Sequence, residues 1–217
     1  MKHKQDSVTE TRRARWFMSL VAVAALVSLA GVAPALYAQY VVDTPAEAAD
    51  IGDGFNDDTV DLIIAVDITP TVENLVIRAK SITVQSGVEI INDFGAYSEV
   101  YMSAYTGDVV VDGADIRARK QVKLENNLDF SLLGKISVSD AILVSSSTLL
   151  PDDPLASPFL GTIYILGKTD VTILDSSLWG ENKLIIVSKT DSVTWHGSTA
   201  GGGGGGGGSS CILDGFY

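Results

Sequence analysis

The chain has 217 residues, of which 46% are hydrophobic, and its 27 acidic residues against 15 basic ones give a net charge of −12. This length suits a single domain, and the hydrophobic content excludes a disordered chain. The excess of negative charge argues against nucleic acid or anionic lipid as a partner. Because Val, Ile, Leu, Thr, Ser, Asp and Gly are abundant, strands joined by turns are favoured over helices.

Residues 1–38 have the three parts of a secretory signal peptide. Three arginines form a basic stretch, an apolar run extends from Trp16 to about Val32, and small residues lead up to Ala38. We expect cleavage after Ala38, which places the rest of the chain in a secreted or cell-surface location. The apolar run is nearly long enough to span a membrane, so a retained anchor is the alternative.

The expected mature chain is strongly acidic and lacks a disulfide. Residues 1–38 hold five Lys/Arg and two Asp/Glu, so 10 basic and 25 acidic residues remain, a net charge of −15. Cys211 is the single cysteine. An exported protein without a cysteine pair depends on burial and backbone pairing for its stability.

Residues 39–74 are interpreted as an acidic N-terminal lead-in with a capping strand. Within them, residues 50–58 read DIGDGFNDD, which has the composition of a calcium loop. Gly52 and Gly54 fall where an EF-hand requires oxygen ligands, so the motif is not met. We therefore expect a solvated acidic linker before the first strand and no metal site.

Residues 75–200 contain five repeated units of alternating apolar residues. The units begin at Leu75, Val100, Leu128, Ile163 and Leu184. Each has an apolar-x-apolar strand, a short polar or glycine link, a second such strand, a small residue and usually one more apolar residue. Units of this kind bury a continuous core only when they are stacked, so the pattern predicts a solenoid. A β-sandwich would explain the alternation but not the recurring small residue.

The second strand of each unit aligns column by column. Its first apolar position holds Ile82, Val109, Ile136, Val171 and Val193. Its second apolar position holds Val84, Val111, Val138, Ile173 and Trp195. The small position holds Gly87, Ala114, Ala141, Ser176 and Ser198. The last apolar position holds Glu89, Ile116, Leu143, Leu178 and Ala200, and the first of these breaks the rule.

Two polar columns accompany the second strand. The position just before it holds Ser81, Asp108, Lys135, Asp170 and Ser192. Stacking would therefore place Lys135 between two aspartates and form a charge ladder, because opposite charges on neighbouring strands stabilise a sheet. The outward column within it holds Thr83, Val110, Ser137, Thr172 and Thr194. Ice binding is a remote alternative for this column, because Val110 interrupts it and Thr is common on strands.

The phrase GKTDVTILDSSLWGENKLIIVSKTDSVTWHGSTAGG resembles the β-helix repeats of filamentous haemagglutinin-type secreted adhesins. The resemblance covers residues 75–200, although this chain is short and its units are uneven. It implies an all-β fold, a right-handed parallel β-helix of about five coils, on an exported surface or matrix protein.

Residues 201–217 begin with eight glycines, which cannot form a packed element. No Lys-Ser/Thr follows them, so they are not a phosphate loop. The CILDGFY that ends the chain echoes TILDSSL of residues 172–178, as if a sixth coil began. We interpret the glycines as an insertion loop at a corner of the solenoid.

Catalytic motifs are not evident in the sequence. His196 is the only histidine of the mature chain and forms no triad or metal pair, and Ser198 lacks the spacing of a nucleophile elbow. Parallel β-helices also house polysaccharide lyases and hydrolases, which need carboxylates gathered from neighbouring coils with a base nearby. The candidate residues for such a site are Asp108, Asp112, Asp170, Asp175, Lys135 and Lys168.

The sequence therefore favours an exported, noncatalytic β-solenoid that acts as an adhesin-like or extracellular matrix module. We expect no catalytic, cofactor-binding or metal-binding residues. The expected partners are other surface proteins, glycans or copies of the same chain, with membrane contact only through the signal segment. The alternative is a polysaccharide-active enzyme on the same scaffold.

Overall fold

The computed structural model describes residues 38–126, 134–147, 161–201 and 210–215. Residues 1–37 of the expected signal peptide and most of the glycine run lie outside the described residues. Among the described residues, no helix is both long and apolar enough to cross a membrane.

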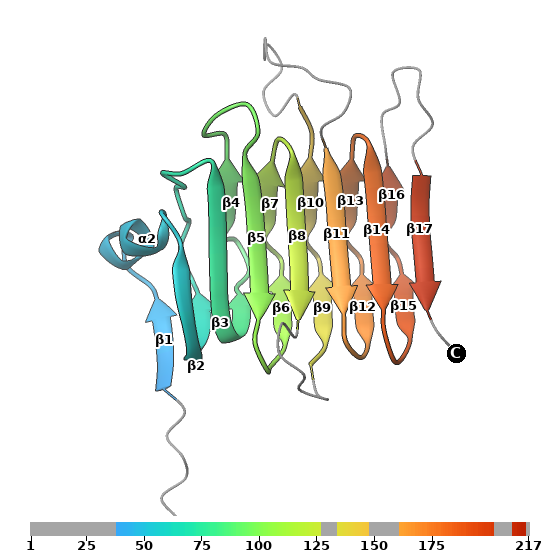
Figure 1. Ribbon diagram of the computed structural model, residues 1–217, viewed down its shortest axis with the longest axis horizontal. Helices are drawn as coiled ribbons and strands as arrows, with labels where there is room; N and C mark the ends of the chain where they lie inside the picture. Colours follow the sequence, from blue (N-terminus) through green and yellow to red (C-terminus); the bar gives the residue numbers. More distant parts are fainter. Residues whose placement is uncertain (1–37, 127–133, 148–160, 202–209, 216–217) are drawn as a thin grey trace, which may run out of the picture. The chain divides into compact units, whose positions relative to one another are not determined.

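Residues from Ala38 onward form a parallel β-solenoid of about six turns, with one short helix (Figure 1). Its larger sheet contains β1 (Ala38–Val42), β2 (Phe55–Ile64), β3 (Asn74–Val84), β5 (Glu99–Ala104), β6 (Val109–Asp112), β8 (Gln121–Asn126), β9 (Ile136–Ser139), β11 (Thr162–Gly167), β12 (Val171–Leu174), β14 (Lys183–Ser188), β15 (Val193–His196) and β17 (Ser210–Gly215). Its smaller sheet contains β4 (Glu89–Asn92), β7 (Asp115–Ala118), β10 (Ile142–Ser145), β13 (Ser177–Gly180) and β16 (Thr199–Gly201). The helix is α2 (Pro45–Ile51).

Each coil contributes to three faces. The long strand β3 belongs to two of them, because residues 74–79 pair with β5 whereas residues 82–84 pair with β6. We call the row β3, β5, β8, β11, β14 and β17 the first face, and the row β3, β6, β9, β12 and β15 the second face. The smaller sheet, in the order β16-β13-β10-β7-β4, is the third face (Figure 1). Between them lies a core of Val, Ile, Leu and Ala side chains, most of them fully buried.

The predicted register of the second strand is confirmed. Ile82 pairs with Val109, Val109 with Ile136, and Ile136 with Val171. Trp195 pairs with Ile173, as the alignment requires. Side chains alternate along a strand, so this register sends the whole apolar column inward.

Three details of the alignment are wrong. The third coil begins with β8, in which Val122 pairs with Val100, and not at Leu128, which lies outside the described residues. At the corner before β4 the first coil has one residue more than the later coils. Val88 is therefore the buried corner residue there, and Ile90 fills the column in which Glu89 was expected.

The N-terminal end of the solenoid is capped by β1 and α2, and the helix was not predicted. Thr44 accepts a hydrogen bond from the Glu47 backbone at 3.3 Å, and the Glu47 carboxylate accepts one from the Thr44 backbone at 3.1 Å. This reciprocal capping box fixes the start of the helix. Ala48 and Ile51 then bury their side chains in the core.

The stack continues past the predicted range at both ends, which gives about six turns in place of about five coils. Before it, β2 pairs with β3, so residues 55–58 of the segment expected to be a solvated linker are in a strand, and residues 50–51 end the helix α2. After it, β17 pairs with β14. An extra coil therefore does begin there, but on the first face, whereas residues 172–178 belong to the second and third faces.

Candidate functional site

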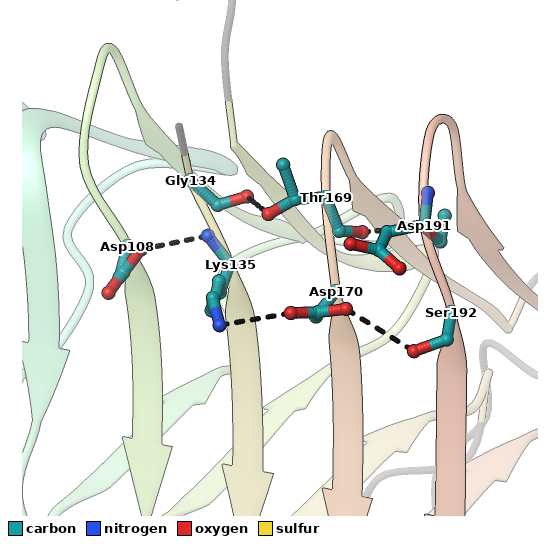
Figure 2. Close-up of polar contacts among 8 residues, drawn as sticks. Asp108, Gly134, Lys135, Thr169, Asp170, Asp191 and Ser192 are labelled. Carbon is teal, nitrogen blue, oxygen red and sulfur yellow. Dashed lines mark hydrogen bonds and ion pairs between the residues drawn. The ribbon is translucent and has the colours of Figure 1, made fainter. Parts of the chain in front are cut away.

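The predicted charge ladder is present on the second face. The Asp108 carboxylate accepts a hydrogen bond from the Lys135 backbone N–H at 2.8 Å, and the Lys135 ammonium lies 2.9 Å from the Asp170 carboxylate (Figure 2). Ser192 donates to the same carboxylate at 3.2 Å (Figure 2). The ammonium thus pairs with one aspartate, and the other aspartate is satisfied by backbone.

The ion pair of this charge ladder shifts the pKa values of Asp170 and Lys135 in opposite directions. The hydrogen bond and charge of Lys135 hold the pKa of Asp170 below its usual value, and those of Asp170 raise the pKa of Lys135. Each group is held in its charged form by the other. We therefore interpret this ion pair as a surface contact that favours the register of the strands, and not as an acid–base pair.

The carboxylates considered for an enzyme are not gathered into one place. Asp108 and Asp170 are two coils apart with Lys135 between them, and Asp112 accepts a hydrogen bond from Ser139 at 2.8 Å. Asp175 is exposed at a corner between strands. Among the described residues, no cluster of three or more His, Cys, Asp or Glu side chains is placed to hold a metal ion.

The other residues named in the sequence analysis have structural contacts or exposed positions. His196 is exposed at the end of β15, and Ser198 donates to its backbone carbonyl at 3.1 Å. The Lys168 backbone N–H, just after β11, donates to the side-chain oxygen of the buried Asn126 at 2.7 Å, and this bond connects the corners after β8 and β11. The outward column from Thr83 to Thr194 is in register, with the interruption that the sequence showed.

A feature that the sequence analysis missed is the distribution of exposed hydrophobic side chains. Within the described part of the chain, the large hydrophobic residues that are exposed by 40% or more are Phe94 (53%), Tyr97 (58%), Ile142 (40%) and Trp179 (41%). Ile142 and Trp179 point outward from the third face, and the two others lie on the loop that joins β4 to β5. Two of these exposed hydrophobic side chains therefore lie on the third face, and the other two lie on the loop that connects it to the first face.

Trp179 belongs to a row of outward positions that runs across the strands of the third face, and Ile142 belongs to the neighbouring outward row. The parallel register places Ile91, Arg117, Val144, Trp179 and Gly201 in one outward column. A Cβ at Gly201 would overlap the six-membered ring of Trp179, so only glycine leaves room for the indole over the last strand. The third face thus presents an apolar strip with an arginine within it.

The loop that carries Phe94 and Tyr97 has a fixed base. Ser98 is buried and donates to the carbonyl of Asn92 at 2.6 Å, and the Phe94 N–H donates to the Asn92 side chain at 3.1 Å. The Tyr97 N–H donates to the Glu73 carboxylate at 2.9 Å. Backbone bonds of this kind hold the loop while both aromatic side chains remain in solvent.

Charge on the third face is mostly negative. Arg117 donates to both oxygens of Asp115, at 2.7 and 2.6 Å, and this bidentate pair raises the pKa of the guanidinium. Around the strip stand exposed carboxylates that do not belong to this pair, namely Glu89, Asp93, Asp140 and Asp175. A hollow of about 190 Å³ beside Ile142 is lined in part by Glu89, Asp115 and Asp140.

The first face differs because its charged and aromatic groups satisfy one another. The ring of Tyr101 has the Arg78 guanidinium 5.5 Å and the Lys123 ammonium 4.7 Å from its centroid. Its hydroxyl donates to Glu125 at 2.6 Å, and Glu125 also pairs with Lys123 at 2.7 Å. Burial raises the pKa of Tyr101, and the Glu125 hydrogen bond adds to this effect.

A signal for the third face was present in the sequence. In AIL and SLW, apolar residues stand next to the inward Leu143 and Leu178, so both sides of a short strand are hydrophobic. Ile142 and Trp179 are these neighbours. An alignment that follows only the inward column does not register them.

Comparison of this chain with protein-family models, with curated proteins and with solved structures finds no match. The parallel solenoid is consistent with a β-helix repeat, and no family match points to haemagglutinin-type adhesins in particular. Function is therefore inferred from the solenoid and its third face.

Proposed function

We propose that this chain is an exported, noncatalytic β-solenoid that serves as an adhesin-like or extracellular matrix module and binds other macromolecules through its third face. The observation that carries the proposal is the exposure of Ile142 and Trp179 on that face and of Phe94 and Tyr97 on the loop that follows β4. Exposed hydrophobic patches on soluble proteins mark interaction sites. Aromatic side chains and arginine are also enriched in protein interfaces.

The solenoid suits this role because it holds the face rigidly. The inward neighbours Ile116 and Leu143 are fully buried, and each strand is paired on both sides in the middle of the stack. A preorganised surface loses little conformational freedom on binding. Likeness to filamentous haemagglutinin-type adhesins is the finer part of the proposal, supported by the repeat phrase and by the parallel stack.

Export is proposed from the signal-like residues 1–38, and β1 begins at Ala38, the last residue of the expected signal peptide. Expression of the full chain in a secreting host should yield a mature N-terminus at or near Gln39, determined by N-terminal sequencing of exported protein. Exported protein that still begins at Met1 would show that the segment is retained.

Binding is tested with the full chain on a glycan array and on a panel of immobilised extracellular proteins, with soluble self-association measured alongside. Trp179→Ala should abolish or weaken by about tenfold the binding that the wild type shows, as for interface hot spots. Val187→Ala, an outward apolar change on the first face, is the matched control. Binding that survives Trp179→Ala and Tyr97→Ser unchanged would overturn the assignment of this face.

A further inference from the structure

We infer that the third face takes a protein partner whose contact surface has an apolar centre and a rim of Lys or Arg, an inference that rests on the proposed function of the face. The first observation is the charge around the strip. Glu89, Asp93, Asp140 and Asp175 are all exposed there. Glu89 begins β4, and Asp140 and Asp175 precede β10 and β13, so these three carboxylates line the edge of the third face at which its strands begin. Asp93 follows β4 at the other edge.

The cations near this face are already engaged. Arg117 holds Asp115 through two hydrogen bonds, and Lys120, at the corner after β7, contacts Glu99. Other lysines, such as Lys123 and Lys183, point outward from the first face. The exposed carboxylates of Asp93, Asp140 and Asp175 therefore leave an excess of negative charge on this face, whereas Glu89 also interacts with Arg117. Opposite charge on a partner steers and selects an encounter with such a face.

The same charge distribution separates the possible occupants. A second copy that docked through its own third face would set carboxylates against carboxylates, which costs specificity and affinity. Polyanionic glycans meet the same repulsion. A protein surface with basic residues around apolar ones gains both from burial of Trp179 and Ile142 and from the acidic rim.

The hollow beside Ile142 gives this partner a defined contact. Its lining combines the Ile142 side chain with the carboxylates of Glu89, Asp115 and Asp140. A lysine has an apolar stem and a charged tip, so its stem would lie along Ile142 while its ammonium meets the carboxylates. One lysine side chain of the partner would thus contact both Ile142 and the carboxylates.

Three synthetic peptides provide the probe. GKLKFKLG combines basic and apolar residues, GELEFELG reverses the charge, and GKSKSKSG removes the apolar residues. Their binding to the full chain is measured by isothermal titration calorimetry at low and at raised salt, together with neutral glycans. We expect GKLKFKLG to bind best and to bind more weakly as salt rises, because salt screens exposed charges.

Matched variants locate the binding. The double variant Asp140→Asn/Asp175→Asn should weaken GKLKFKLG binding about threefold, and Trp179→Ala should weaken it about tenfold. Both aspartates have positive φ, 49° and 46°, a conformation that asparagine also adopts readily. Asp53→Asn/Asp58→Asn makes the same change in net charge at the N-terminal end and should leave binding unchanged.

Other results would overturn the inference. Equal binding of GELEFELG, or equal losses in both double variants, would show that the rim does not select the partner. If neutral glycans bind through Trp179 and the peptides do not, the face functions as proposed but its partner class is wrong. If no probe depends on Trp179, the proposed function fails as well.

Discussion

Lys135 uses its backbone for one aspartate and its side chain for another, and this division follows from stacking. In a parallel ladder each residue meets its equivalent one coil before and one coil after. The Lys135 N–H therefore reaches Asp108 on one side while its ammonium reaches Asp170 on the other. Neighbouring carboxylates would repel each other, so the lysine separates two like charges.

Lys135→Met should lower the melting temperature near neutral pH. The pKa of Asp170 is lowered in the folded state, so its contribution is present above the unfolded pKa and is lost as pH falls through the folded one. The pKa of Lys135 is raised, so its contribution is present below the unfolded pKa and is lost as pH rises through the folded one. The difference between wild type and variant should shrink as pH falls below about 4, the usual pKa of an aspartate, and vanish once Asp170 is protonated in the folded state as well.

Thermal unfolding followed by circular dichroism across this pH range measures the effect. Lys168→Met is the control, because Lys168 forms no ion pair with the described residues. A difference that persists unchanged at low pH would mean that the lysine acts through packing and not through charge.

At the scale of elements, the inward side chains of the second face are less buried toward the C-terminal end. Ile173 on β12 is fully buried, whereas Trp195 on β15 is half-buried and packs against the core. The Trp195 indole N–H donates to the Ser198 carbonyl at 3.1 Å. The larger side chain thus covers the end of the core and uses its polar edge to hold the next corner.

Ile173→Ala should therefore destabilise the protein more than Trp195→Ala does. Loss of a fully buried isoleucine costs about 3 kcal/mol, and loss of a half-buried tryptophan should cost about 2 kcal/mol. Urea unfolding of both variants gives the comparison. A larger loss for Trp195→Ala would show that its ring is fully covered in solution, and a negligible loss would show that it does not pack on the core.

At the scale of the whole solenoid, the two ends differ. β1 and α2 close the N-terminal end, whereas among the described strands β15 and β16 each pair on one side only. β17 continues the stack over β14 alone. Because the coils of a solenoid contact only their neighbours, stability should fall toward β15 and β16, which among the described strands are paired on one side only.

Hydrogen exchange should show this gradient. Backbone amides of β15 and β16 should exchange sooner than those of β6 and β9, and amides of β1 and β2 should be intermediate or protected. Exchange followed by mass spectrometry of peptic fragments measures each segment. Uniform protection from β2 to β16 would mean that the solenoid opens as one cooperative unit.

The sequence alone determined the stacking of the second strand. Its apolar columns, the corner residues of the later coils and the place of Lys135 all follow from a period of two and from the need to cover an apolar face. The charge ladder could be predicted for the same reason, since a position beside a buried column has a fixed neighbour on the next coil.

Only the tertiary structure decided the features that the alternation of apolar residues does not determine, namely where a coil begins and how long its corners are. Leu128 and Val122 both begin alternating stretches, and unequal coil lengths leave the choice to strand pairing. One extra corner residue before β4 reverses which side chain points inward, so Ile90 replaced Glu89. The third face remained hidden because each of its strands is short, and its outward residues become a surface only when the coils are stacked.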